Sequence, residues 1–252
     1  MGTELQVRLT GLSAPGPLLD LVQSQPDLES WWKACPSPEL LLWLAARLCT
    51  TDQQRRVVLS CLAELNRRAQ HGARRIDPRT GQAVAAAEAW ARGSASDEGR
   101  LDQLLAAERG ALAAAAAADV QATEINARAR ALFRCAPRAR AASFSNSRAL
   151  GALADWREAD RARRLALAAA AAARAAAEAA RAEARGSAEA GSDGDSAVLA
   201  ANQPDGWAAS VGESAGYAAS ALAPGRPAKP GDRTARHAAR LVRRRLPCPQ
   251  LD

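Results

Sequence analysis

Alanine dominates this chain and limits what it can fold into. Of the 252 residues, 66 are alanine, so the 48% that count as hydrophobic include few large side chains. Leu, Ile, Val and Phe together supply 42 residues, a fraction below the level at which complete folding is expected. Only two Ile, nine Val, six Trp, two Phe and one Tyr are present, and these are the residue types that favour strands. The composition therefore predicts an all-α protein, part of which stays unpacked.

The large apolar residues are concentrated towards the N-terminus. Leu, Ile, Val, Met, Phe, Trp and Tyr supply 30 of the first 112 residues and 20 of the last 140. This distribution predicts a small antiparallel helical bundle, followed by long Ala/Arg-rich helices and a largely disordered C-terminal tail. The expected parts are an N-terminal arm with a short helix (1–35), a compact helical domain (36–118), extended Ala/Arg-rich helices (119–185), a flexible linker (186–233) and a basic tail with a short helix (234–252).

Capping residues place the expected helices. Ser37 and Pro38 form an N-cap followed by an N1 proline, and they precede an almost wholly apolar segment over 40–48, which we expect to be the central buried helix. Asp52 and Asp77 can cap the next two helices. The alanine runs at 113–118 and 165–185 have high helix propensity but little side chain to bury, so we expect them to pack poorly and to be exposed to solvent.

The residue types used for catalysis and metal binding are sparse. The chain has two His, and its five Cys contain no CxxC pair, so we predict neither a metal site nor a cofactor, and no enzymatic activity. Cys49 and Cys61 lie on apolar helix faces, where a free thiol behaves as a small hydrophobe. Four tryptophans could line a pocket, but large core anchors are the interpretation we favour. These are Trp31, Trp32, Trp43 and Trp90.

Positive charge gathers at the C-terminus. Residues 224–252 hold eight of the 34 Lys and Arg but two of the 27 acids, and Arg outnumbers Lys 32 to 2, a bias typical of GC-rich genomes. A basic helix with interleaved apolar residues can contact nucleic-acid phosphates or an anionic surface, although a solvated Arg-rich extension has the same pattern. The candidate contacts are Arg236, Arg240, Arg243, Arg244 and Arg245. No apolar stretch approaches the ~20 residues that span a bilayer, so we expect a soluble, cytoplasmic protein.

One element resembles a known family. The segment 83–98, AVAAAEAWARGSASDE, is similar to helical immunity proteins of bacterial polymorphic toxin systems, in which an Ala-Glu-Ala-Trp-Ala-Arg-Gly element joins two helices. The corresponding residues here are Glu88, Trp90, Arg92 and Gly93, and the acidic turn that follows contains Asp97 and Glu98. Spacing alone predicts that Trp90 is buried at a helix corner ended by Gly93.

Two hypotheses on function follow. The first is a non-enzymatic helical protein-interaction module, and the resemblance implies an immunity-type protein whose partner is a toxin that it neutralises by binding. The alternative is a nucleic-acid-associated protein that uses its Arg-rich tail without sequence specificity.

Overall fold

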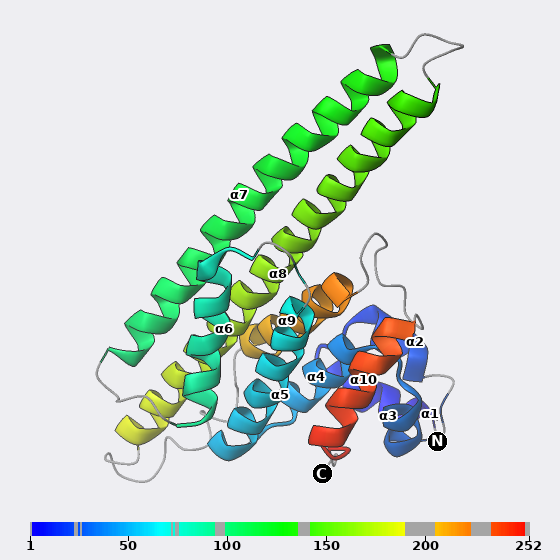
Figure 1. Ribbon diagram of the computed structural model, residues 1–252. Coiled ribbons are helices and arrows are strands. Elements are labelled where there is room, and N and C mark those ends of the chain that lie inside the picture. The colour runs from blue at the N-terminus through cyan, green and yellow to red at the C-terminus, as the bar shows by residue number, and fades with distance from the viewer. Residues whose placement is uncertain are drawn as a thin grey trace.

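The computed structural model is all-α, with ten helices and no strand among the residues it describes (Figure 1). These are residues 2–249 except 23–24, 26, 72, 74–75, 94–98, 136–141, 190–204 and 223–232. The helices are α1 (Gly2–Gly11), α2 (Gly16–Val22), α3 (Leu28–Ala34), α4 (Pro38–Arg47), α5 (Asp52–Gln70), α6 (Pro78–Ala91), α7 (Arg100–Cys135), α8 (Ala142–Glu189), α9 (Asp205–Leu222) and α10 (Arg233–Arg245). Within the described residues, no helix has a stretch long and apolar enough to cross a membrane.

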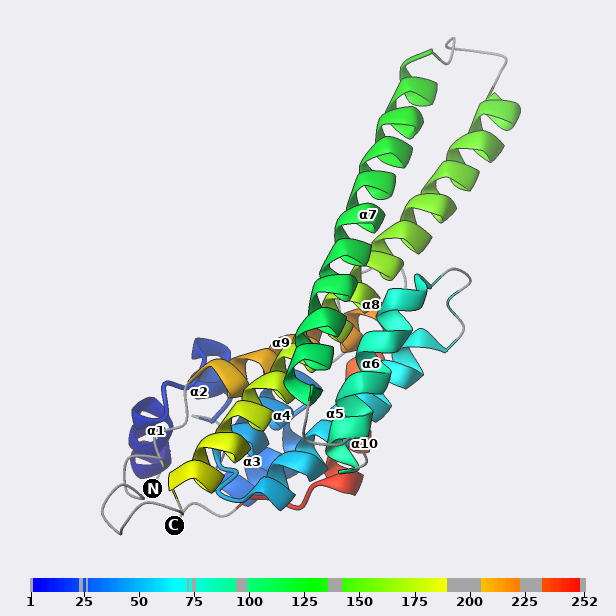
Figure 2. The same cartoon turned by 90° about the vertical axis from the view of Figure 1, so that its left-hand side faces the viewer.

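Helices α7 and α8 form a long antiparallel pair. Arg163 pairs with Asp119 at 3.5 Å, and Arg174 pairs with Glu108 at 2.7 Å. Residue numbers therefore increase along α8 where those of its partners in α7 decrease. Figures 1 and 2 show one end of this pair projecting beyond the body of the molecule. The other end of α8 lies inside the body, where it packs against α5, α6 and α9 as well as α7.

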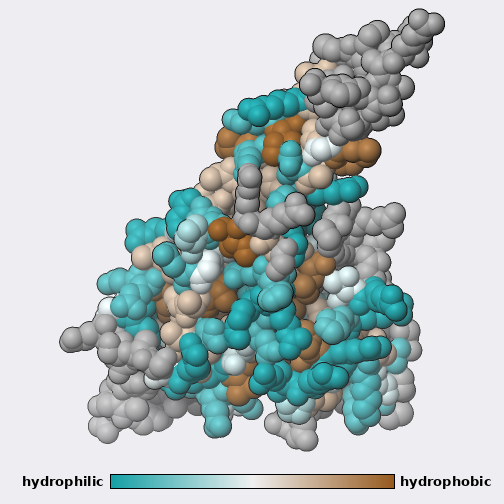
Figure 3. Space-filling model, in the orientation of Figure 1, coloured by the Kyte–Doolittle hydropathy of each residue, from teal (hydrophilic) through white to brown (hydrophobic). Residues whose placement is uncertain are grey.

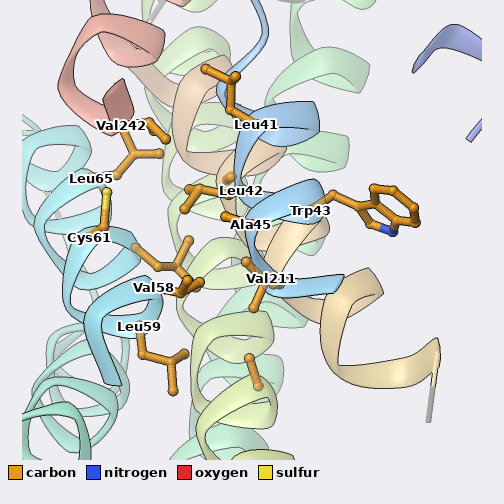
Figure 4. Packing of buried hydrophobic residues seen from close by; sticks show 14 of the residues in the cluster. Leu41, Leu42, Trp43, Ala45, Val58, Leu59, Cys61, Leu65, Val211 and Val242 are labelled. Atoms are coloured by element: carbon orange, nitrogen blue, oxygen red, sulfur yellow. The ribbon is translucent and has the colours of Figure 1, made fainter. Parts of the chain in front are cut away.

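Helix α4 is buried over most of its circumference, as its apolar sequence predicts. Every residue from Leu40 to Ala46 is buried, and Ser37 caps the helix by accepting a hydrogen bond from the Leu40 amide at 3.3 Å. Figure 4 shows the side chains of Leu42, Val58 and Val242 gathered between α4, α5 and α10. The tail helix α10 is therefore part of the same core as the N-terminal helices.

The cap of α5 differs from the expected one. Thr51, not Asp52, is the N-cap: its hydroxyl accepts from the Gln54 amide, and the Gln54 side chain accepts from the Thr51 amide at 3.1 Å. This reciprocal capping box satisfies two backbone donors at once. Asp52 is the first helical residue and instead forms an ion pair with Arg55.

The alanine run of α8 is buried, which corrects the expectation that it packs poorly against its neighbours. Residues 168–173 and 175–177 are at most 3% exposed, and Leu165 is 1% exposed. A methyl side chain adds little thickness to a helix, so several helices can approach α8 closely and surround it. The expectation holds better for 113–118, where Ala114 and Ala115 are buried but three of the other four alanines are exposed.

Helix α9 lies within the stretch expected to be a flexible linker, so that expectation is wrong for Asp205–Leu222. Its Trp207, Val211 and Ala215 are at most 2% exposed, and a Cβ added to Gly212 would already touch Trp43 of α4 at 3.4 Å. The buried Ser214 hydroxyl donates to the Ala168 carbonyl of α8 and accepts from Asn66 of α5. Residues 186–189 of the expected linker are also helical, because they form the end of α8. Residues 190 to 204 and 223 to 232 lie outside the described residues.

We predict that enlarging one alanine of this central helix destabilises the protein. Ala172 is fully buried, and added methylenes in a close-packed site cost ~1–3 kcal/mol. Ala172→Leu should therefore lower the midpoint of thermal unfolding measured by circular dichroism. Ala116→Leu, an equal change at an exposed position of α7, is the matched control and should leave the midpoint within a degree or two. Equal midpoints for the two variants would contradict a close-packed α8.

Candidate interaction surface

The family-like element forms a helix corner. Trp90 is 1% exposed, as its spacing predicts, and Gly93 donates its amide to the Trp90 carbonyl at 2.9 Å. Gly93 has a φ of 69°, a left-handed conformation that favours glycine. A Cβ at this position would also lie 2.8 Å from Nη1 of Arg56. The backbone conformation therefore favours glycine here, and a larger residue would also make the end of the Arg56 side chain shift.

Arg56 ties this corner to two other helices. Its guanidinium carbon lies 5.7 Å from the centre of the Trp90 ring, a cation–π distance. Its Nη2 donates to Glu183 Oε1 of α8 at 2.6 Å. The corner therefore has a fixed position relative to α5 and α8. Asp97 and Glu98, the acidic turn of the resemblance, lie outside the described residues.

Three glutamates near this corner each pair with two arginines. Glu64 forms ion pairs with Arg68 and Arg245, both at 2.6 Å. Glu88 forms ion pairs with Arg67 at 2.6 Å and with Arg92 at 3.8 Å. Glu183 pairs with Arg56 at 2.6 Å and with Arg100 at 3.9 Å. These nine residues, which we call the arginine–glutamate network, are Arg56, Glu64, Arg67, Arg68, Glu88, Arg92, Arg100, Glu183 and Arg245.

Counted over its own nine side chains, the network has six arginines and three carboxylates, an excess of three positive charges. Its three groups join α5 to α6, to α10, and to α7 and α8, so residues as far apart in sequence as Glu64 and Arg245 meet. Figure 3 shows mainly hydrophilic side chains over the α5 and α10 part of the front face. This surface combines an excess of cations with a rigid helical support.

A groove of about 410 Å³ opens beside the network. Its apolar residues are Val57, Cys61 and Ala91, and its cations are Arg56, Arg92 and Arg245. We call it the α5–α6–α10 groove; Gln53 and Ser60 complete its lining. Arg92 and Arg245 are candidates from separate sequence patterns, and no short pattern indicates that they line one groove. Arg56 and Val57 carry no sequence signal that would mark them as part of a surface.

The five candidate arginines of the tail divide into two groups. Arg243 donates to the carbonyls of Trp32 and Cys35, and Arg245 belongs to the network. Arg236, Arg240 and Arg244 are exposed, and their four-residue spacing places them along one face of α10 at steps of ~6 Å. The opposite face is buried through Ala235, Ala238, Ala239 and Val242. We call the exposed trio the α10 stripe.

Three cysteines of the described core carry no activated thiol. Burial raises the pKa of Cys35 to about 11 and the pKa values of Cys49 and Cys61 to about 12, so these thiols stay protonated near neutral pH. Burial also raises the pKa of Glu178, which lies against α9. In the described part of the chain, no three His, Cys, Asp or Glu side chains form a group that could hold a metal.

The four candidate tryptophans lie in the core. Trp31, Trp32, Trp43 and Trp90 are at most 7% exposed, which confirms that they are anchors of the bundle. No model of a known protein family, no curated protein and no solved structure matches this chain.

We predict that the helix corner depends on Trp90. Removing a buried aromatic ring costs ~3–5 kcal/mol, a large part of the ~5–15 kcal/mol that stabilises a typical domain, and it also removes the cation–π contact with Arg56. Trp90→Ala should therefore sharply lower the midpoint of thermal unfolding. Val57→Ala, a truncation at a 42% exposed position of the neighbouring helix, is the control and should change it little. An unchanged midpoint for Trp90→Ala would show that the ring does not support the corner.

Proposed function

We propose that this chain is a non-enzymatic helical protein-interaction module that binds an acidic surface of another protein. The observation that carries the proposal is the arginine–glutamate network, whose six arginines and three glutamates lie on a helical scaffold. Positive and negative surfaces that complement each other speed association and select the partner. Because the guanidinium groups are already held by carboxylates, little side-chain entropy is lost when a partner binds.

An immunity-type role in the cytoplasm is the form of this function that we favour. The residues that carry the resemblance to immunity proteins contribute directly to the candidate surface: Glu88 and Arg92 belong to the network, and Trp90 and Gly93 form the corner beneath it. A toxin is neutralised when a bound protein covers its active site, and this mechanism needs shape and charge but no chemistry of its own.

A test of this role uses the gene that neighbours this one in the genome. If that gene encodes a toxin, cells that express it should stop growing, and co-expression of this chain should restore growth. The two purified proteins should then form a stable complex in size-exclusion chromatography. A toxin that stays lethal in the presence of the well-expressed chain would contradict the immunity-type role. An unrelated toxin serves as the specificity control.

The α10 stripe favours a second candidate function, non-specific binding to nucleic acid. Arg236, Arg240 and Arg244 form a cationic row that can follow phosphates. Arg243 and Arg245 do not belong to this row. They hold α10 in place, because Arg243 donates to the Cys35 carbonyl and Arg245 donates to Glu64. Deleting α10 would confuse the test, because Ala238, Val242 and Leu246 belong to the core.

Charge reversal of the stripe tests this candidate cleanly. If α10 binds duplex DNA, affinity should fall with salt with a log–log slope of about −0.9 per phosphate contacted, or about −3 for three contacts. The triple variant Arg236→Glu, Arg240→Glu and Arg244→Glu should lose this binding. The control Arg128→Glu with Arg130→Glu changes two exposed arginines of α7 and should keep it. Absence of DNA binding by the unmodified chain at low salt would exclude this candidate.

A further inference from the structure

We infer that the α5–α6–α10 groove is the docking site for an acidic segment of the partner that carries an apolar side chain among its carboxylates. This inference rests on the proposed function and specifies where and by what chemistry the partner binds. It depends on three properties of the groove: its depth, its apolar floor and the two cations at its rim.

The groove is shallow and open. Five of its eight lining residues are themselves exposed to solvent, namely Gln53, Val57, Ser60, Arg92 and Arg245. Sites for small molecules enclose most of the surface of their ligand. An open groove between helices instead suits one side chain of a segment that continues over the surrounding surface.

The floor of the groove is apolar. Cys61 and Ala91 are 5% and 9% exposed and form its base, whereas Val57 is 42% exposed at its side. Val57 therefore leaves apolar surface in water that an aliphatic side chain of a partner would cover, a contribution of ~25 cal/mol for each Å² buried. The raised pKa of Cys61 keeps that thiol uncharged and compatible with such a contact.

Two arginines at the rim retain most of their exposure. The side chains of Arg92 and Arg245 are each 63% exposed although each pairs with a glutamate. Arg92 is the C-cap of α6 and Arg245 is the last residue of α10, so the exposed cations that line the groove come from different helices. Guanidinium groups bind carboxylates with strong charge-assisted hydrogen bonds. Arg56, fixed by Trp90 and Glu183, adds a third positive charge.

The arrangement favours an acidic protein segment over a nucleic-acid strand. Glu64 and Glu88 lie among these arginines and are each 23% exposed. A phosphate backbone, which carries charge at short regular intervals, would meet these carboxylates as well as the cations. A peptide needs only two carboxylates for the two rim arginines, so it brings fewer like charges near these glutamates, and it can also set an apolar side chain against Val57.

The test uses a fluorescent peptide in which one leucine lies between two pairs of glutamates. Fluorescence anisotropy at low salt should show saturable binding to the full chain. The double variant Arg92→Glu with Arg245→Glu should weaken that binding at least ~10-fold, because opposite charges become like charges. Val57→Ser should weaken it ~3-fold or more by removing the apolar contact. The control Arg128→Glu with Arg130→Glu carries the same charge change on α7 and should bind the peptide as the unmodified chain does.

Several results would overturn the inference. These are an absence of saturable binding, equal affinity for a peptide with serine in place of leucine, and equal affinity for the two double variants. Tighter binding of single-stranded DNA that displaces the peptide and depends on Arg92 and Arg245 would assign the groove to nucleic acid. Circular dichroism melts of each variant verify that the fold is retained. If the chain neutralises a toxin but does not bind the peptide, the groove is not the docking site and the proposed function is retained. If the peptide binds but no toxin is neutralised, only the immunity-type role is rejected.

Discussion

The close packing of helices around the alanine segment of α8 is the constraint on which the rest of the structure depends. Helices α5, α6, α7 and α9 all contact α8, and the residues from Ala168 to Ala177 are buried with the exception of Arg174. Alanine buries little area on its own. Short distances between helices compensate, because dispersion contacts among backbone and Cβ atoms increase as the helices approach. The same principle explains α9, where Gly212 lies against Trp43 and Ser214 lies against Ala168. Larger residues at these positions would separate the helices that carry the candidate surface.

Arginine compensates for the thin apolar core in a second way, by capping helices other than its own. Arg161 of α8 donates to the Ala69 carbonyl at the end of α5, and Arg243 of α10 donates to the Cys35 carbonyl after α3. Arg47 and Arg164 likewise donate to the carbonyls of Leu12 and Ser220. The last carbonyls of a helix lack partners within it, and a charged donor favours the negative end of the helix dipole. A long planar side chain with several donors reaches these carbonyls across the bundle, so the high arginine content has structural uses beyond surface charge.

Short sequence patterns predicted the elements that are stabilised by interactions between residues close together in the sequence. The cap at Ser37, the buried helix that follows it and the burial of Trp90 each depend on neighbouring residues, and all three are present. Helix α9 escaped prediction because its glycine, serine and alanine residues give a weak apolar signal and its stability comes from close contact with α4 and α8. The arginine–glutamate network could not be predicted from the sequence for another reason. The pair Glu64–Arg245 spans 181 residues, and Arg56–Glu183 spans 127; no short pattern encodes a contact of that kind.

The burial of one face of α10 changes how its charge acts. A disordered basic tail would keep many conformations and lose entropy whenever it bound a partner. Here Ala238 and Val242 hold the helix against the core, and Arg243 fixes it to the end of α3. The α10 stripe and Arg245 are therefore presented at set positions relative to Arg92 and Val57. Rigid presentation lowers the entropic cost of binding and makes the geometry of the charges selective. A charge excess that looks like a mobile extension in the sequence thus becomes one edge of a shaped surface, and its effect on a partner depends on position as well as on sign.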